Sequence, residues 1–206
     1  IIGPSVNTDA FRPYRGGGSP KVIKIAAMIR PSTPRRAPEL TMNVLREIKL
    51  RYDTKVEINV FGADAKNDIR DARFFESIQA NFEYNDFGKL NPKQMAILLG
   101  DADIFVDFSS FQAMGLTAME AMACGCAVIL PREGGTGDFA KDRSNAMVVD
   151  TTSQENCVRA LSELIDSREL RERLANQAIV DMCKFMPEFS AFKFLTAVFG
   201  EGENKC

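Results

Sequence analysis

The sequence predicts an α/β domain of the Rossmann-like type, with a doubly wound parallel sheet of about six strands and helices on both of its faces. Apolar runs of strand length alternate with stretches of helical periodicity along most of the 206 residues. One stretch, FVDFSSFQAMGLTAMEAMACGCAVILP at 105–131, reads as strand, glycine turn, helix and strand without interruption. This order defines a βαβ unit, which places two parallel strands beside each other.

The remaining elements follow in the same alternating order. Short apolar runs predict strands at 21–29, 55–61, 82–87, 104–108, 127–130 and 145–150. Helical spacing of apolar residues predicts helices at 38–52, 68–80, 92–100 and 116–123, two more with inward faces at 158–165 and 170–185, and a last one at 190–199. Pro92 suits a first helical turn, whereas Pro187 is expected to interrupt the chain before the last helix.

Three segments are expected. Residues 1–20 contain four glycines and three prolines, which is typical of a linker. Residues 21–186 carry the alternating elements of one domain, a length that suits a single core. Residues 187–206 hold the last helix and a tail.

Composition excludes several classes of protein. The formal net charge of −2 gives no reason to expect nucleic acid as a partner. No apolar run approaches the ~20 residues that span a bilayer, and no signal peptide is visible, so we expect a cytoplasmic protein without a direct membrane segment. Membrane docking in a longer, full-length protein is the alternative that we keep.

The titratable residues narrow the chemistry. Five cysteines is an odd number, and Cys124 and Cys126 have no common zinc or redox spacing, so reduced, structural thiols are expected. The chain contains no histidine, which excludes Ser-His and Cys-His nucleophile systems and histidine metal ligands. Any chemistry must therefore use carboxylates, Arg, Lys or backbone groups, and no acidic cluster with metal spacing calls for a metal ion.

A basic loop follows the first predicted strand. IRPSTPRRAPE places Arg30, Arg35 and Arg36 within seven residues, between prolines that stiffen the loop. Guanidinium groups bind phosphate oxygens in pairs of hydrogen bonds, and the carboxyl end of a parallel strand is the ligand side of such a sheet. A solvated basic loop without a ligand is the alternative.

The second candidate group lies in the 105–131 stretch. The helix begins after Gly115, so the free N–H groups near Leu116 and Thr117 could meet a phosphate, and the Glu120 carboxylate could accept hydrogen bonds from ribose hydroxyls. Gln112 precedes this turn. Alternatively, Glu120 only stabilises the positive end of the helix dipole. GGTG at 134–137 is either a loop that approaches a ligand or a plain turn.

These residues resemble the signature of the group 1, retaining glycosyltransferases (family 4) of the GT-B fold. FQAMGLTAMEAMACG keeps the family's Gly115, Leu116 and the segment EAMACG from Glu120. Gly134 and Gly135 match the family's downstream glycine pair, and VNTDAFRP is similar to the phrase that leads into the second half of these enzymes. RPSTPRR is similar to a subgroup of bacterial surface-polysaccharide enzymes that includes rhamnosyltransferases.

The resemblance implies the C-terminal, donor-binding half of a GT-B enzyme, which binds a nucleotide diphospho-sugar and transfers the sugar with retention to an acceptor hydroxyl in polysaccharide or glycoconjugate synthesis. It implies no cofactor and no metal, and a glycan or lipid-linked acceptor bound by an N-terminal domain that this chain lacks. The final helix would cross back to that domain. The implied catalytic residues are Arg30, Arg35, Arg36, Gln112 and Glu120, and the implied substrate-binding residues are Gly88, Leu90, Gly115, Leu116, Thr117 and Glu120.

The chain departs from the family pattern at several positions. Gln112 stands where the family has the first glutamate of its pair, and an amide cannot carry negative charge or act as a base. Ala113 and Met114 replace Gly-Phe, and Asp138 replaces a glutamate. A non-catalytic module that binds nucleotide sugars is therefore the alternative function. A nicotinamide-binding domain is disfavoured, because no G-x-G-x-x-G follows Ile29.

Overall fold

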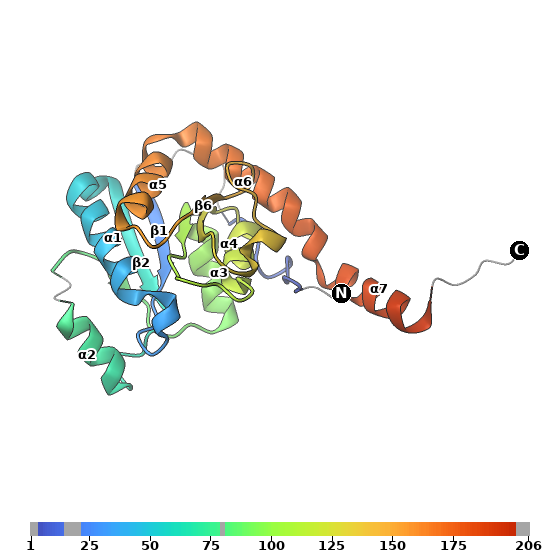
Figure 1. The fold of residues 1–206 in the computed structure, drawn as a ribbon, viewed down its shortest axis with the longest axis horizontal. Helices are drawn as coiled ribbons and strands as arrows, with labels where there is room; N and C mark the ends of the chain where they lie inside the picture. The colour runs from blue at the N-terminus through green and yellow to red at the C-terminus, as the bar shows by residue number, and fades with distance from the viewer. Residues whose placement is uncertain (1–3, 15–21, 79–80, 201–206) are drawn as a thin grey trace, which may run out of the picture.

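Six parallel strands form the centre of the protein (Figure 1), whose computed structural model describes residues 4–14, 22–78 and 81–200. The strands are β1 Ile23–Met28, β2 Val56–Phe61, β3 Asn85–Asp86, β4 Ile104–Val106, β5 Ala127–Pro131 and β6 Met147–Val149. Their order in the sheet is β3-β2-β1-β4-β5-β6. This order confirms the predicted doubly wound parallel sheet. Strands are added outward in one direction from β1 to β3 and in the opposite direction from β4 to β6, so the switch point lies between β1 and β4.

The described part of the chain contains seven α-helices. They are α1 Pro38–Tyr52, α2 Ile69–Ser77, α3 Pro92–Asp101, α4 Leu116–Ala123, α5 Gln154–Asp166, α6 Arg168–Met182 and α7 Pro187–Phe199. Side-chain caps account for several starts: Asp68 caps α2, and Asn91 forms a capping box with Gln94 at α3. Ser153 and Ser167 cap α5 and α6.

Two apolar layers cover the two faces of the sheet. Alternate side chains of β1 point to opposite faces, so Ile25 joins one layer and Ala26 joins the other. The first layer contains α1 and α5, and the second contains α3, α4 and α6. Ile25 lies opposite both Ile58 and Ile104 in register, which fixes the central strands on an aliphatic layer.

Several predicted elements differ from the structure in their bounds, and two of these differences have a clear physical reason. The strand expected at 82–87 shortens to Asn85–Asp86, because Phe82 and Tyr84 pack as a ring pair, 5.1 Å between centroids, against the first layer. The last helix begins at Pro187 and not at residue 190, because a proline at the first helical position loses no hydrogen bond. Residues 21 and 79–80 of the predicted elements lie outside the described residues, as do 15–20 of the predicted linker.

The first described segment, residues 4–14, packs against the domain. Val6 and Phe11 are buried in the second layer, and the Val6 N–H donates to the carbonyl oxygen of Phe185 at 2.7 Å. The chain thus brings its first described residues beside the end of α6. The division at residue 20 stays a prediction.

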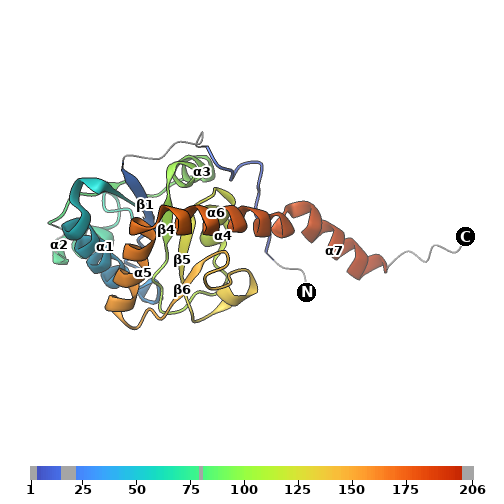
Figure 2. The same ribbon diagram turned by 90° about the horizontal axis from the view of Figure 1, so that it is seen from above.

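Helix α7 extends away from the sheet (Figures 1 and 2). None of its residues is buried, and its exposed apolar side chains are Phe189, Phe192, Phe194, Leu195, Val198 and Phe199. A helix that is apolar around most of its circumference is normally covered in the folded protein. Within the described ranges, no helix has both the length and the apolar character needed to cross a membrane.

Candidate functional site

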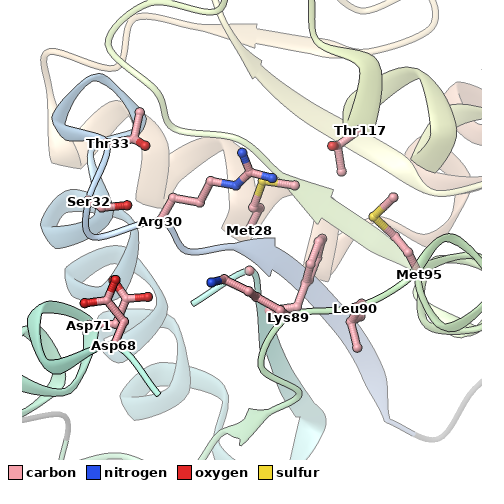
Figure 3. Close-up of a pocket in the computed structure, with 12 residues that line it drawn as sticks. Met28, Arg30, Ser32, Thr33, Asp68, Asp71, Lys89, Leu90, Met95 and Thr117 are labelled. Atoms are coloured by element: carbon pink, nitrogen blue, oxygen red, sulfur yellow. The ribbon is translucent and has the colours of Figure 1, made fainter. Parts of the chain in front are cut away.

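A pocket of about 440 Å³ opens at the carboxyl ends of the central strands, next to the switch point between β1 and β4, where the strand order reverses. Open α/β sheets bind ligands at this position, and the volume suits a small molecule. Figure 3 shows the pocket, whose lining residues are Met28, Arg30, Ser32, Thr33, Phe61, Gly62, Asp68, Asp71, Lys89, Leu90, Met95 and Thr117.

Two cationic side chains lie in the middle of the pocket. Figure 3 shows Arg30 and Lys89 between the carboxylates of Asp68 and Asp71 on one side and Met95 on the other. The Lys89 ammonium also lies 3.4 Å from a carboxylate oxygen of Asp64. Two cations on neighbouring loops are suited to a diphosphate, which carries its charge over several oxygens.

The acidic side of the pocket has one unusual group. Asp71 is only 4% exposed, and its Oδ2 accepts a hydrogen bond from the Asp64 N–H at 2.7 Å. Its Oδ1 is buried and has no hydrogen-bond partner within the described residues. Asp68, in contrast, caps α2 and pairs with the exposed Arg70, whose guanidinium lowers the pKa of Asp68 to about 2.

Only one of the three arginines of the basic loop lines the pocket. Arg30 does so, whereas Arg35 donates to the carbonyl oxygen of Phe111 at 3.4 Å. Arg36 donates to the buried carboxylate of Asp107 at 3.1 Å. Burial is the main cause that lowers the pKa of Arg36, and the charge of Asp107 opposes it.

Gln112 is buried, with 2% of its surface exposed. Its side-chain amide donates to Asp107. Its backbone forms a β-bridge with Gly134 in the loop after β5, residues 132–138, which we call the glycine loop. The Gln112 N–H donates to the carbonyl oxygen of Glu133 at 3.1 Å, and the Gly135 N–H donates to that of Gln112 at 2.7 Å. Gln112 therefore contributes to the framework of the site and does not line the pocket.

Helix α4 begins where the sequence predicts. Gly115 has a φ of 79°, which favours glycine, and precedes Leu116. Thr117 lines the pocket, whereas Gly115, Leu116 and Glu120 do not. Glu120 is half-buried, its carboxylate makes no hydrogen bond or ion pair among the described residues, and burial raises its pKa to about 7.

The loop after β3 contributes more than the sequence indicates. Leu90 lines the pocket, and Gly88, with a φ of 63°, accepts a hydrogen bond from the Gly62 N–H at 2.8 Å. This bond ties the loop to the end of β2. Lys89 stands between these two predicted residues and was missed, although a lysine beside a predicted ligand loop is a recognisable signal. Asp71 gave no such signal, because an acid in a predicted helix is usually solvated.

Comparison with known proteins assigns the class and then the family. The doubly wound sheet with a charged pocket at its switch point defines a Rossmann-like α/β domain. A family model described as "Glycosyl transferases group 1" matches residues 24–181, so the chain belongs to this family. The chain is 21% identical over 198 residues to the D-inositol 3-phosphate glycosyltransferase of Streptosporangium roseum, covering 90% of this chain and 46% of that protein.

Solved structures of glycosyltransferases and related proteins have the same fold. The C-terminal domain of the group 1 glycosyltransferase LpcC from Francisella tularensis matches with a TM-score of 0.68 and 19% identity, over 87% of this chain and 97% of that one. Anabaena Alr3699/HepE in complex with UDP-glucose matches with a TM-score of 0.76 and 12% identity, over 96% of this chain and 56% of that one. These matches confirm the predicted fold, the C-terminal half of a GT-B glycosyltransferase. The chain spans about half the length of the curated relatives that it matches.

Proposed function

We propose that the pocket binds a nucleoside diphospho-sugar, as the donor for retaining transfer to an acceptor hydroxyl in polysaccharide or glycoconjugate synthesis. The observation that carries the proposal is the placement of Arg30 and Lys89 beside the N-terminal turn of α4, in a pocket at the switch point of the sheet. The HepE structure, which has this fold, was solved with UDP-glucose. The diphosphate would lie on the two cations, and the base would lie near Leu90 and Met95.

The proposed chemistry is stabilisation of the leaving group. When the bond between sugar and phosphate breaks, negative charge grows on the diphosphate. Arg30, Lys89 and the free N–H groups at the start of α4 offset this charge. Arg35 and Arg36 support the loop that carries Arg30. Glu120, one turn inside α4, would accept hydrogen bonds from the ribose. A metal ion is not needed for this step in the proposed mechanism.

The first experiment measures binding of UDP, GDP and dTDP to the purified chain by calorimetry. We expect one of them to bind, and Arg30→Ala or Lys89→Ala to weaken binding at least about 10-fold, because each removes a charge-assisted contact of about 1.5–3 kcal/mol. Arg51→Ala is the matched control, since Arg51 is exposed and lies on the far end of α1. Absence of binding by all three nucleotides would contradict the proposal.

The alternative is a module that binds nucleotide sugars without turnover. It is favoured by Gln112, whose amide is neutral and turned toward Asp107. Sugar transfer by the full-length protein decides between the two: transfer supports the enzyme, whereas nucleotide binding without transfer or donor hydrolysis supports the module.

We further propose that α7 packs against an acceptor-binding half. In the chain alone, Phe192→Gln combined with Phe199→Gln should change the free energy of unfolding by less than about 0.5 kcal/mol, because both rings are exposed. In the full-length protein the same pair should cost about 2 kcal/mol or more, since the rings would be buried. Equal effects in urea unfolding of both proteins would rule this packing out.

A further inference from the structure

Asp107 lies just after β4, at the centre of the loops that form the carboxyl edge of the sheet. Its carboxylate is buried, and both oxygens accept hydrogen bonds. Oδ2 accepts from the Arg36 guanidinium at 3.1 Å and from the Gln112 amide. Oδ1 accepts from the N–H of Ser109 at 3.0 Å and from its hydroxyl. The carboxylate is thus fully hydrogen-bonded, as a buried charge requires.

Backbone contacts extend this network to the neighbouring loops. The Ser110 N–H donates to the carbonyl oxygen of Arg35 at 2.9 Å, which joins the segment after β4 to the arginine loop. The Thr151 hydroxyl donates to the carbonyl oxygen of Ser109 at 2.8 Å, which joins it to the loop after β6. Gln112 joins it to the glycine loop after β5. Four loops therefore meet around one carboxylate.

The hydrogen bond between Gln112 and Asp107 explains why residue 112 is an amide and not a carboxylate. A carboxylate only accepts hydrogen bonds, so the amide of Gln112 must turn its NH₂ toward Asp107. A glutamate at 112 would place a second buried carboxylate against the first, next to a single guanidinium, Arg36. The negative charge that Gln112 lacks is therefore present one hydrogen bond away, on Asp107.

We propose that Asp107 is a positioning residue that fixes the arginine loop and the 112–117 segment relative to each other. Gln112 belongs to this framework as a hydrogen-bond donor to Asp107. Asp107 does not line the pocket. It acts on the ligand by fixing the backbone that leads to Arg30 and to the start of α4. This effect on the ligand rests on the function proposed above.

A double-mutant cycle tests the pairing. Asp107→Asn and Gln112→Glu should each lower the folding equilibrium constant at least about 10-fold. The first leaves Arg36 without its carboxylate partner, and the second sets two buried carboxylates against each other. In the double variant the folding equilibrium constant should fall at least about 10-fold less than the product of the two single effects predicts. The amide and the carboxylate then exchange places, and Arg36 keeps a carboxylate partner. Gln112→Met, which removes the amide without adding charge, completes the cycle with Asp107→Asn if Gln112→Glu does not fold.

The matched control is an exposed pair of the same chemistry. The Gln177 amide donates to Asp181 at 3.2 Å on the surface of α6, and Gln177→Glu should change the equilibrium constant less than about 3-fold. Single effects on Asp107 and Gln112 that simply multiply would overturn the proposal.

Nucleotide binding supplies the second readout. At a temperature where the variant is folded, Asp107→Asn should lower the affinity for the nucleoside diphosphate that binds the wild-type chain at least about 5-fold. Adding Gln112→Glu to the same chain should restore this affinity. A merely structural contact would not produce this restoration. If the wild-type chain binds no nucleotide, the proposed function fails, while the unfolding cycle still tests the network. Unchanged affinity in folded Asp107→Asn would overturn the positioning role.

Discussion

Gly134→Ala is expected to destabilise the protein by at least about 3 kcal/mol, the largest effect of a single methyl group that the structure predicts. Gly134 has a φ of 112° and a ψ of −154°, a conformation that is essentially restricted to glycine. A Cβ there would lie 2.0 Å from the carbonyl oxygen of Gln112, which is backbone and cannot rotate away. The loop after β5 would have to leave the 112–115 segment.

Gly137 provides the control for this substitution within the same loop. A Cβ at Gly137 meets no atom within 4 Å, so Gly137→Ala should be neutral or slightly stabilising. Thermal unfolding measures both, and a loss of about 3 kcal/mol corresponds to a fall in Tm of roughly 6–12 °C for a chain of this size. Equal melting temperatures for the two variants would contradict the close backbone contact.

Glu120→Gln should raise stability above neutral pH and weaken donor binding. Burial raises the pKa of Glu120 to about 7, so the folded chain binds this proton more tightly than the unfolded chain does. Its contribution to stability is therefore complete below the ordinary pKa of 4.5 and is lost as the pH rises through about 7. Glutamine stays neutral, and at pH 8 we expect a gain of about 1–2 kcal/mol, reduced by partial exposure of the side chain.

The difference in unfolding free energy between the variant and the wild type isolates this group from other carboxylates. It should be near zero at pH 4 and rise between pH 5 and 8. Glu76→Gln, on the exposed side of α2, is the control variant. Calorimetry should show donor affinity reduced at least about 10-fold, since an amide offers one acceptor oxygen to the ribose hydroxyls in place of two. A difference that does not depend on pH would argue against a raised pKa.

The sequence was sufficient for the architecture, because its signals were local. Pro38 and Gly115 mark helix starts that the structure reproduces at the same residues, and alternating apolar runs place the central strands to within a few residues. The strand at 82–87 failed because Phe82 and Tyr84 resemble strand residues but pack their rings against each other, and the Tyr84 ring also stacks on Phe75. Packing between distant segments decides such cases, and periodicity does not record it.

The candidate site likewise contains residues that the sequence predicted and contacts that it could not predict. Arg30, Leu90 and Thr117 were predicted, and the structure places them together at one pocket. Arg36 could not be distinguished from Arg30 by sequence, because its partner Asp107 follows 71 residues later. Gln112 was recognised as unusual, but its cause, a buried carboxylate five residues earlier, appears only when the loop is folded.

Helix α6 packs against α4 and continues through a short 3-10 turn, Cys183–Phe185, into α7. Helix α4, whose Thr117 lines the pocket, is therefore connected to the exposed rings of α7 through its packing on α6. Whatever covers α7 is held at a set distance and orientation from the start of α4 without touching the pocket. Helix α7 thus determines where a partner that covers its rings would lie relative to the pocket.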